Sequence, residues 1–89
     1  MAFVPHRFQT IMQQINITIL YFAVFKERTQ RETEERTVST NTTVSELFEQ
    51  IFKGSDKSVR YAVNEEFVPP NTPLEEGDVV AFIPPLGGG

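Results

Sequence analysis

Apolar and polar residues alternate over the segment 15–22 (INITILYF). Every second position there is large and apolar: Ile15, Ile17, Ile19 and Tyr21. Successive side chains of a strand point to opposite faces, so this period predicts a strand with one buried face. The next segment, 23–30 (AVFKERTQ), favours one or two helical turns. Residues 32–39 (ETEERTVS) are polar except for Val38 and predict an exposed edge strand, whose charges discourage edge pairing.

The clearest helix signal lies in the segment 43–54. Thr43 and Glu46 have the spacing of a capping box, in which each side chain binds the backbone N–H of the other residue. Apolar residues then recur on a single helix face: Val44, Leu47, Phe48, Ile51 and Phe52. Gly54 stands where the helix is expected to end. We interpret the apolar stripe as core packing against a sheet.

The last third of the chain predicts three further strands. Residues 59–64 (VRYAVN) form one strand and 65–68 (EEFV) a short return, with a turn near Asn64. Residues 69–78 predict a loop, because their three prolines cannot donate to a sheet ladder. The segment 79–83 (VVAFI) is apolar on both faces, which is typical of a central strand or of one covered on its second face.

These elements predict an α+β fold, with one main amphipathic helix on a mixed sheet of four or five strands. We expect the first and last strands, the most apolar ones, to lie side by side in the middle of the sheet. A chain of 89 residues suits a single domain. Its predicted parts are a flexible N-terminal extension (1–14), the folded domain (15–83) and an extended C-terminal arm (84–89).

Composition excludes several kinds of chemistry. The chain has no cysteine, so disulfides, thiolate nucleophiles and zinc–thiolate sites are impossible. The one histidine, His6, has no carboxylate near it in the sequence, and we predict no metal site. Apolar runs stay far below the roughly 20 residues of a membrane span. No nucleophile–base pair or phosphate-binding glycine loop is recognisable, and we interpret the acidic pairs, such as Glu65 and Glu66, as solvated charges.

Charge is distributed unevenly along the chain. Residues 1–60 carry eight basic and seven acidic side chains, whereas residues 61–89 carry five acidic side chains and no basic one. The acidic third is either an ordinary solvated surface or a device that steers the protein toward a basic partner cleft. With no basic stripe in the sequence, we expect no binding of nucleic acid.

The C-terminal segment FIPPLGGG has an unusual composition. Pro84 and Pro85 hold the backbone extended, and the residues from Pro84 onward can reach about 20 Å. Glycines have no Cβ, so this tip could enter a narrow channel in another protein. A terminal carboxylate becomes a reactive acyl group after adenylylation or phosphorylation. The hypothesis is a carrier whose terminal carboxyl group is activated and delivered to a partner; the alternative is an idle tail.

The chain resembles the MoaD family, the small ubiquitin-like subunits of molybdopterin synthase, over about residues 15–89. Three stretches carry the resemblance: 20–28 (LYFAVFKER), 43–51 (TVSELFEQI) and 62–89, with AVNEEFV followed by TPLEEGDVVAFIPPLGGG. The resemblance implies a β-grasp fold, which agrees with the predicted elements. Two features depart from the family pattern: a short KGSDKS segment, and no glycine after the first helix at TQR.

The resemblance also implies a function, that of a non-catalytic sulfur carrier in molybdenum cofactor biosynthesis. An E1-like, MoeB-like enzyme would use ATP to adenylate the carboxylate of Gly89, and a sulfur donor would convert it to a thiocarboxylate. The arm would then enter a MoaE-like large subunit, which holds the catalytic residues, in a 2:2 heterotetramer. The protein itself is expected to bind no cofactor and no membrane, and to be cytoplasmic.

Individual residues acquire roles by their positions in the family pattern. Gly88 and Gly89 form the functional terminus, and Pro84, Pro85, Leu86 and Gly87 form the arm. Ile83 and Phe67 match positions at which the family presents apolar surface to partners. The triple glycine is also similar to ThiS, the thiamin sulfur carrier. A ThiS-like carrier, a ubiquitin-like modifier conjugated through Gly89, and a binding module with an idle tail therefore stay open.

Overall fold

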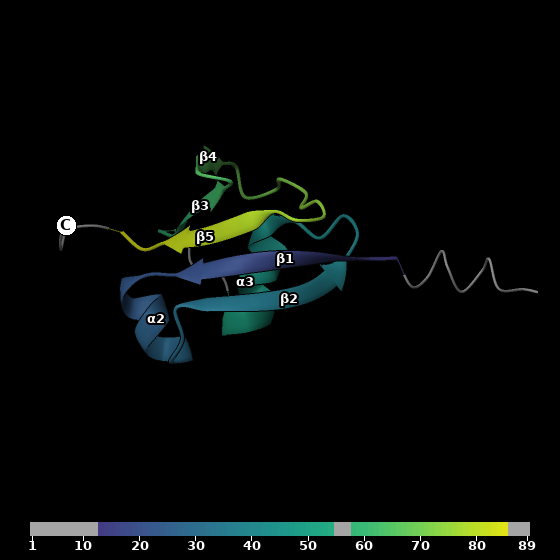
Figure 1. Ribbon diagram of the computed structural model, residues 1–89. Coiled ribbons are helices and arrows are strands. Elements are labelled where there is room, and N and C mark those ends of the chain that lie inside the picture. The colour runs from purple at the N-terminus through teal and green to yellow at the C-terminus, as the bar shows by residue number, and fades with distance from the viewer. Residues whose placement is uncertain (1–12, 55–57, 86–89) are drawn as a thin grey trace, which may run out of the picture.

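The computed structural model describes residues 13–54 and 58–85. Within these residues, five strands form one sheet in the order β2-β1-β5-β3-β4, and two helices accompany it (Figure 1). The elements are β1 (Gln14–Tyr21), α2 (Ala23–Thr29), β2 (Thr33–Ser39), α3 (Val44–Phe52), β3 (Arg60–Val63), β4 (Glu66–Val68) and β5 (Val79–Ile83). The α+β prediction is confirmed, and the arrangement is a ubiquitin-like β-grasp.

The first and last strands lie together at the centre of the sheet, as predicted from their apolar residues. β1 and β5 run parallel, with Thr18 opposite Val79 and Tyr21 opposite Phe82. On its other side β5 pairs antiparallel with β3. β2 pairs antiparallel with β1 and ends the sheet, so the predicted edge strand is also confirmed.

The main helix α3 is capped as the sequence predicts. The Thr43 Oγ1 accepts a hydrogen bond from the Glu46 backbone N–H at 3.2 Å, and the Glu46 Oε1 accepts one from the Thr43 N–H at 3.0 Å. The helix ends at Phe52, but the left-handed residue that closes it is Lys53, with φ of 58°, and not Gly54. The Lys53 N–H donates to the Glu49 carbonyl, so backbone hydrogen bonding holds this ending without a glycine.

The core lies between α3 and one face of the sheet. The Phe48 ring of α3 lies 5.2 Å from the Phe82 ring of β5 and 6.2 Å from the Tyr61 ring of β3, measured between centroids. Phe25 of α2 joins the same cluster, 5.5 Å from Phe48. Edge-to-face contacts between such rings add to the free energy of apolar burial. The predicted buried face of the first strand is confirmed as part of this core: Ile15, Ile17, Ile19 and Tyr21.

The turn after α2 forms without the glycine that the family commonly has there. Gln30 takes the left-handed conformation, with φ of 63°, and its N–H donates to the Lys26 carbonyl. Its side-chain Nε2 also donates to the Glu27 carbonyl at 3.0 Å. These bonds offset the strain of a non-glycine residue at positive φ. The departure at TQR therefore leaves the local geometry of the turn intact.

Candidate functional site

The position of β5 in the sheet explains why all five of its residues are apolar. Val80 and Phe82 point into the core and are fully buried. The residues between and beside them face the opposite side of the sheet, where no helix of the described part of the chain covers them: Val79, Ala81 and Ile83. Strand alternation thus gives β5 one core face and one apolar outer face.

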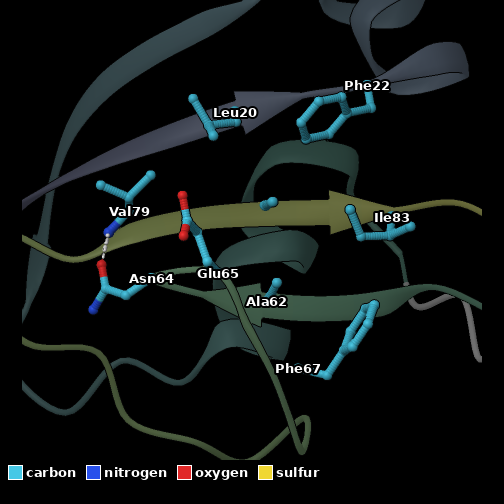
Figure 2. Close-up of a pocket in the computed structure, with 9 residues that line it drawn as sticks. Leu20, Phe22, Ala62, Asn64, Glu65, Phe67, Val79 and Ile83 are labelled. Carbon is cyan, nitrogen blue, oxygen red and sulfur yellow. Dashed lines mark hydrogen bonds between the residues drawn. The ribbon is translucent and has the colours of Figure 1, made fainter.

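The outer face of the sheet is hollowed. We call it the outer surface and define it by the residues that line a hollow of about 540 Å³: Leu20, Phe22, Ala62, Asn64, Glu65, Phe67, Val79, Ala81 and Ile83. Figure 2 shows Leu20 and Phe22 on one side of β5, and Ala62 and Phe67 on the other. Phe22 is 46% exposed and Phe67 is 64% exposed. Large apolar side chains gathered on an open surface are typical of an interaction site.

The structure brings together the two apolar residues that the sequence predicts as partner contacts. Phe67 comes from β4 and Ile83 from the end of β5, and both line the hollow. Sequence reasoning missed Leu20 of β1 and Phe22, the residue directly after β1, which line the same hollow. A signal was present, because the segment INITILYF becomes apolar at consecutive positions toward its end. Like β5, β1 is apolar on both faces at that point.

The arm leaves the domain beside the hollow. Pro84 and Pro85 follow Ile83 directly; Pro84 is half-buried and Pro85 is exposed. Proline has no backbone N–H, which fits the end of β5 at Ile83. The other predicted tail residues lie outside the described residues: Leu86, Gly87, Gly88 and Gly89. Their roles, like the predicted N-terminal extension, therefore stay predictions.

A hydrogen-bonded turn fixes one end of the hollow. The Asn64 Oδ1 accepts from the Val79 N–H at 3.0 Å, and the Asn64 Nδ2 donates to the Asp78 Oδ1 at 3.0 Å. Asp78 also accepts from the Glu75 N–H at 2.8 Å through its other oxygen, Oδ2. The asparagine of AVN and the aspartate of GD thus tie the β3–β4 turn to the start of β5. These sequence stretches position the outer surface.

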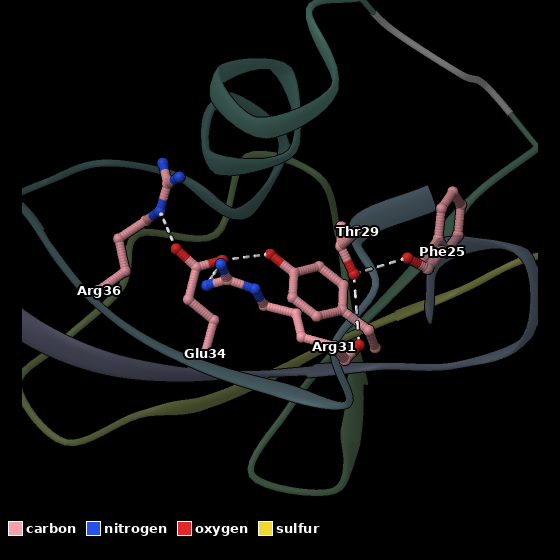
Figure 3. A network of polar contacts seen from close by, with 6 residues as sticks. Phe25, Thr29, Arg31, Glu34 and Arg36 are labelled. Carbon is pink, nitrogen blue, oxygen red and sulfur yellow. Dashed lines mark hydrogen bonds and ion pairs between the residues drawn. The ribbon is translucent and has the colours of Figure 1, made fainter. Parts of the chain in front are cut away.

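A polar network on the core side of β1 has a structural role (Figure 3). The buried Tyr21 hydroxyl donates to the Glu34 Oε1 at 2.6 Å, and the Arg36 Nε donates to the Glu34 Oε2 at 3.0 Å. Burial alone would raise the pKa of Glu34, but the hydrogen bonds from Tyr21 and Arg36 and the charges of Arg36 and Arg31 hold it below its ordinary value. Burial, with the bond to Glu34, raises the pKa of Tyr21. The network satisfies a buried hydroxyl and joins β1 to β2.

Other kinds of site find no support in the described ranges. Residues 13–54 and 58–85 contain no group of three or more His, Asp or Glu side chains placed to hold a metal ion. None of the helices described is long and apolar enough to cross a membrane. The outer surface with its adjoining arm is therefore the candidate site that the geometry favours.

Comparison with known proteins gives relatives of this chain. The model of the ThiS family matches residues 19–89. A molybdopterin synthase sulfur carrier subunit of Mycobacterium tuberculosis is 34% identical over 82 residues, which covers 84% of this chain and 99% of that protein. The chain is thus homologous to a protein of that description along nearly its whole length.

Solved structures with similar folds include subunits of molybdopterin converting factors. A candidate molybdopterin converting factor, subunit 1, of Pyrococcus furiosus is 28% identical with a TM-score of 0.69, covering 81% of this chain and 99% of that one. A chain in the complex of subunits 1 and 2 of the molybdopterin-converting factor of Helicobacter pylori is 25% identical with a TM-score of 0.54, covering 84% of this chain and 100% of that one. These likenesses support the β-grasp assignment and offer a related fold seen with a partner subunit.

Proposed function

Because the chain belongs to the ThiS family, we propose that it is the sulfur carrier subunit of a molybdopterin synthase. The observation that carries the proposal is the meeting, at Ile83, of an uncovered apolar hollow and the Pro84–Pro85 segment, whose proline rings favour an extended backbone. A carrier must bind a partner and at the same time send its terminus away from its own domain. A hollow that ends where the arm begins serves both needs.

The proposed chemistry takes place at the carboxylate of Gly89. A carboxylate oxygen attacks the α-phosphorus of ATP on an E1-like partner, and pyrophosphate leaves. A hydrosulfide from the donor then attacks the acyl carbon of the adenylate and displaces AMP, which gives a thiocarboxylate. Where the donor presents the sulfur as a persulfide, the attack gives an acyl disulfide, and a reducing thiol cleaves its S–S bond to release the thiocarboxylate. ATP is bound by the activating partner, so the carrier needs no cofactor of its own. Gly88 and Gly87 keep the path to the carbonyl carbon free of side chains.

The proposed synthase partner is the large subunit of molybdopterin synthase. The Helicobacter pylori complex of subunits 1 and 2 supports a partner of this kind, since one of its chains is similar to this one. An apolar side chain of the partner would fill the hollow between Phe67 and Phe22. We further propose that catalytic residues lie on the large subunit, that two copies of each subunit assemble, and that the complex works in the cytoplasm.

The test is an intact-mass measurement after coexpression with an adenylating enzyme and a sulfur donor. We expect a gain equal to the replacement of one oxygen by sulfur, localised to Gly89 by fragmentation. The matched control adds one alanine after Gly89, which moves the carboxylate and leaves the described domain unchanged. An unmodified mass, with both helper proteins active on another carrier, would contradict the proposal.

A second experiment separates the pathways that share this chemistry. The gene is introduced into cells that lack their own molybdopterin synthase small subunit, and molybdoenzyme activity is measured. We expect activity to return with the native chain and not with a chain that lacks Gly88 and Gly89. Rescue of thiamin-requiring cells instead would indicate a ThiS-like role. Conjugates of high mass that disappear without Gly89 would indicate a protein modifier.

A further inference from the structure

Arg60 lies between the two predicted contact residues of the outer surface. It is the first residue of β3, and in the sheet it stands directly opposite Ile83 of β5. Its guanidinium carbon lies 4.8 Å from the centroid of the Phe67 ring. An arginine over an aromatic face is attracted by the ring quadrupole and keeps its N–H groups available at the edge. Arg60 therefore holds a positive charge at the arm end of the hollow.

The charge of Arg60 is not neutralised within the described residues. Lys26, Arg31 and Arg36 each form an ion pair with a glutamate, whereas no carboxylate of the described residues pairs with Arg60. The chain after Arg60 carries five acidic side chains and no basic one. Arg60 thus places a positive charge beside an apolar hollow, directly before the acidic third of the chain.

The opposite end of the hollow carries a negative charge. Glu65 lines the hollow beside Asn64, whose N–H donates to the Val79 carbonyl at the start of β5. Val79 and Ile83 are four steps apart along the strand, or about 13 Å. Glu65 has φ of 74° in a turn where glycine would be unstrained. The carboxylate of Glu65 therefore places a negative charge at this end of the hollow.

We propose that the outer surface selects its partner, the large synthase subunit, by a pair of opposite charges at the two ends of the hollow. A carboxylate of the partner faces Arg60 near the arm, a cation of the partner faces Glu65, and an apolar side chain fills the space between them. This inference rests on the proposed function, because it describes the partner of that same surface.

Two physical arguments support this arrangement. Docking on the apolar hollow removes water from its rim, and a desolvated charge without a counter-charge is costly. Opposite charges at the two ends also make the surface electrostatically polar. A partner that docked in the reverse direction would place like charges together, so the pair favours the orientation that points the arm correctly.

The test is the affinity of the purified full-length chain for the large subunit, measured by calorimetry with variants at both ends. We expect Arg60→Glu and Glu65→Lys each to weaken binding by about tenfold or more. High salt should reduce the difference in affinity between the native chain and each variant, because it screens the charges. Arg60→Lys, which keeps the charge, should bind nearly as tightly as the native chain, and Arg60→Ala should bind clearly less tightly.

Matched controls are available on the same domain. Arg28 lies over the Phe52 ring at 4.6 Å on the helical side, so Arg28→Glu changes the same kind of contact away from the hollow. Glu66 adjoins Glu65 but does not line the hollow. Glu66→Lys therefore makes the same change of charge outside the hollow. Both controls should bind like the native chain. Thermal unfolding of every variant shows whether the fold is kept.

The outcomes separate this inference from the proposed function. Native binding that is unaffected by Arg60→Glu and Glu65→Lys would overturn the inference and leave the carrier function standing. An Arg60→Lys variant as weak as Arg60→Ala would also overturn it, because the positive charge at that position would then contribute nothing to binding. No binding of the native chain to the large subunit would overturn both.

Discussion

Phe67 and Phe82 test the assignment of the two sheet faces, because the same residue type occurs on each. Phe82 is 0% exposed and lies within 6.5 Å, between ring centroids, of Phe25, Phe48 and Tyr61. Truncation to alanine leaves a cavity in that cluster. We expect Phe82→Ala to lower the free energy of unfolding by about 3–5 kcal/mol. That is a large share of the roughly 4–13 kcal/mol available to a domain of this size.

The corresponding change at Phe67 should lower the free energy of unfolding much less. The residue is 64% exposed, so only about a third of the roughly 200 Å² of a phenylalanine is removed from water by the fold. At about 25 cal/mol per Å², that burial contributes under about 2 kcal/mol, and the contact with Arg60 adds about 0.5 kcal/mol. We expect Phe67→Ala to cost about 1–2 kcal/mol of stability and still to weaken binding to the large subunit by more than about tenfold.

Two assays test the assignment of the two sheet faces. Urea unfolding followed by far-ultraviolet circular dichroism gives the free energy of unfolding of each variant, and calorimetry gives the affinity for the large subunit. A loss of stability at Phe67 as large as that at Phe82 would refute the assignment of faces. Native affinity in a folded Phe67→Ala variant would refute the role of the outer surface.

Three other changes probe the hollow, its turn and the polar network. Ile83→Asp should abolish detectable binding to the large subunit in calorimetry, while the domain still unfolds cooperatively. The reason is that a charge is tolerated in water but not in a desolvated interface. Loss of the fold would place Ile83 in the core. Glu65→Gly should raise the free energy of unfolding in urea by about 0.5–1 kcal/mol, since φ of 74° favours glycine; a decrease would show that the turn is not strained. Glu34→Gln should lower the free energy of unfolding by about 1–2 kcal/mol at neutral pH. Because the folded pKa of Glu34 is lowered, its contribution is present above the ordinary value of 4.5 and is lost as the pH falls through the folded pKa. The difference between native and variant stability should therefore shrink in acid; a constant difference would contradict the assignment.

Most of the fold could be predicted from the sequence, because each of its signals is local. The alternation from Ile15 to Tyr21 and the spacing of Thr43 and Glu46 depend only on the geometry of one strand or one helix turn. Those regularities require no knowledge of distant contacts. Residues that close turns were harder to predict. The structure uses Lys53 and not Gly54, because backbone hydrogen bonds can offset the strain that glycine would avoid.

Only part of the candidate site followed from the sequence. The family pattern marked both Ile83 and Phe67, and a last strand that is apolar on both faces agrees with that pattern. Leu20 and Phe22 went unnoticed because they lie about 60 residues from Ile83 along the chain and read as the end of an ordinary strand. Their proximity to Ile83 requires the parallel pairing of β1 with β5.

The sequence by itself therefore determined most of the elements and the unusual composition of the terminal segment. Only the tertiary structure decided that four strands contribute to the outer surface, and that Arg60 and Glu65 lie at opposite ends of its hollow. The physical reason is the range of the forces involved. Periodicity and capping are fixed by neighbours within a few residues, whereas a surface is fixed by strand order and register, which the burial of the whole core selects.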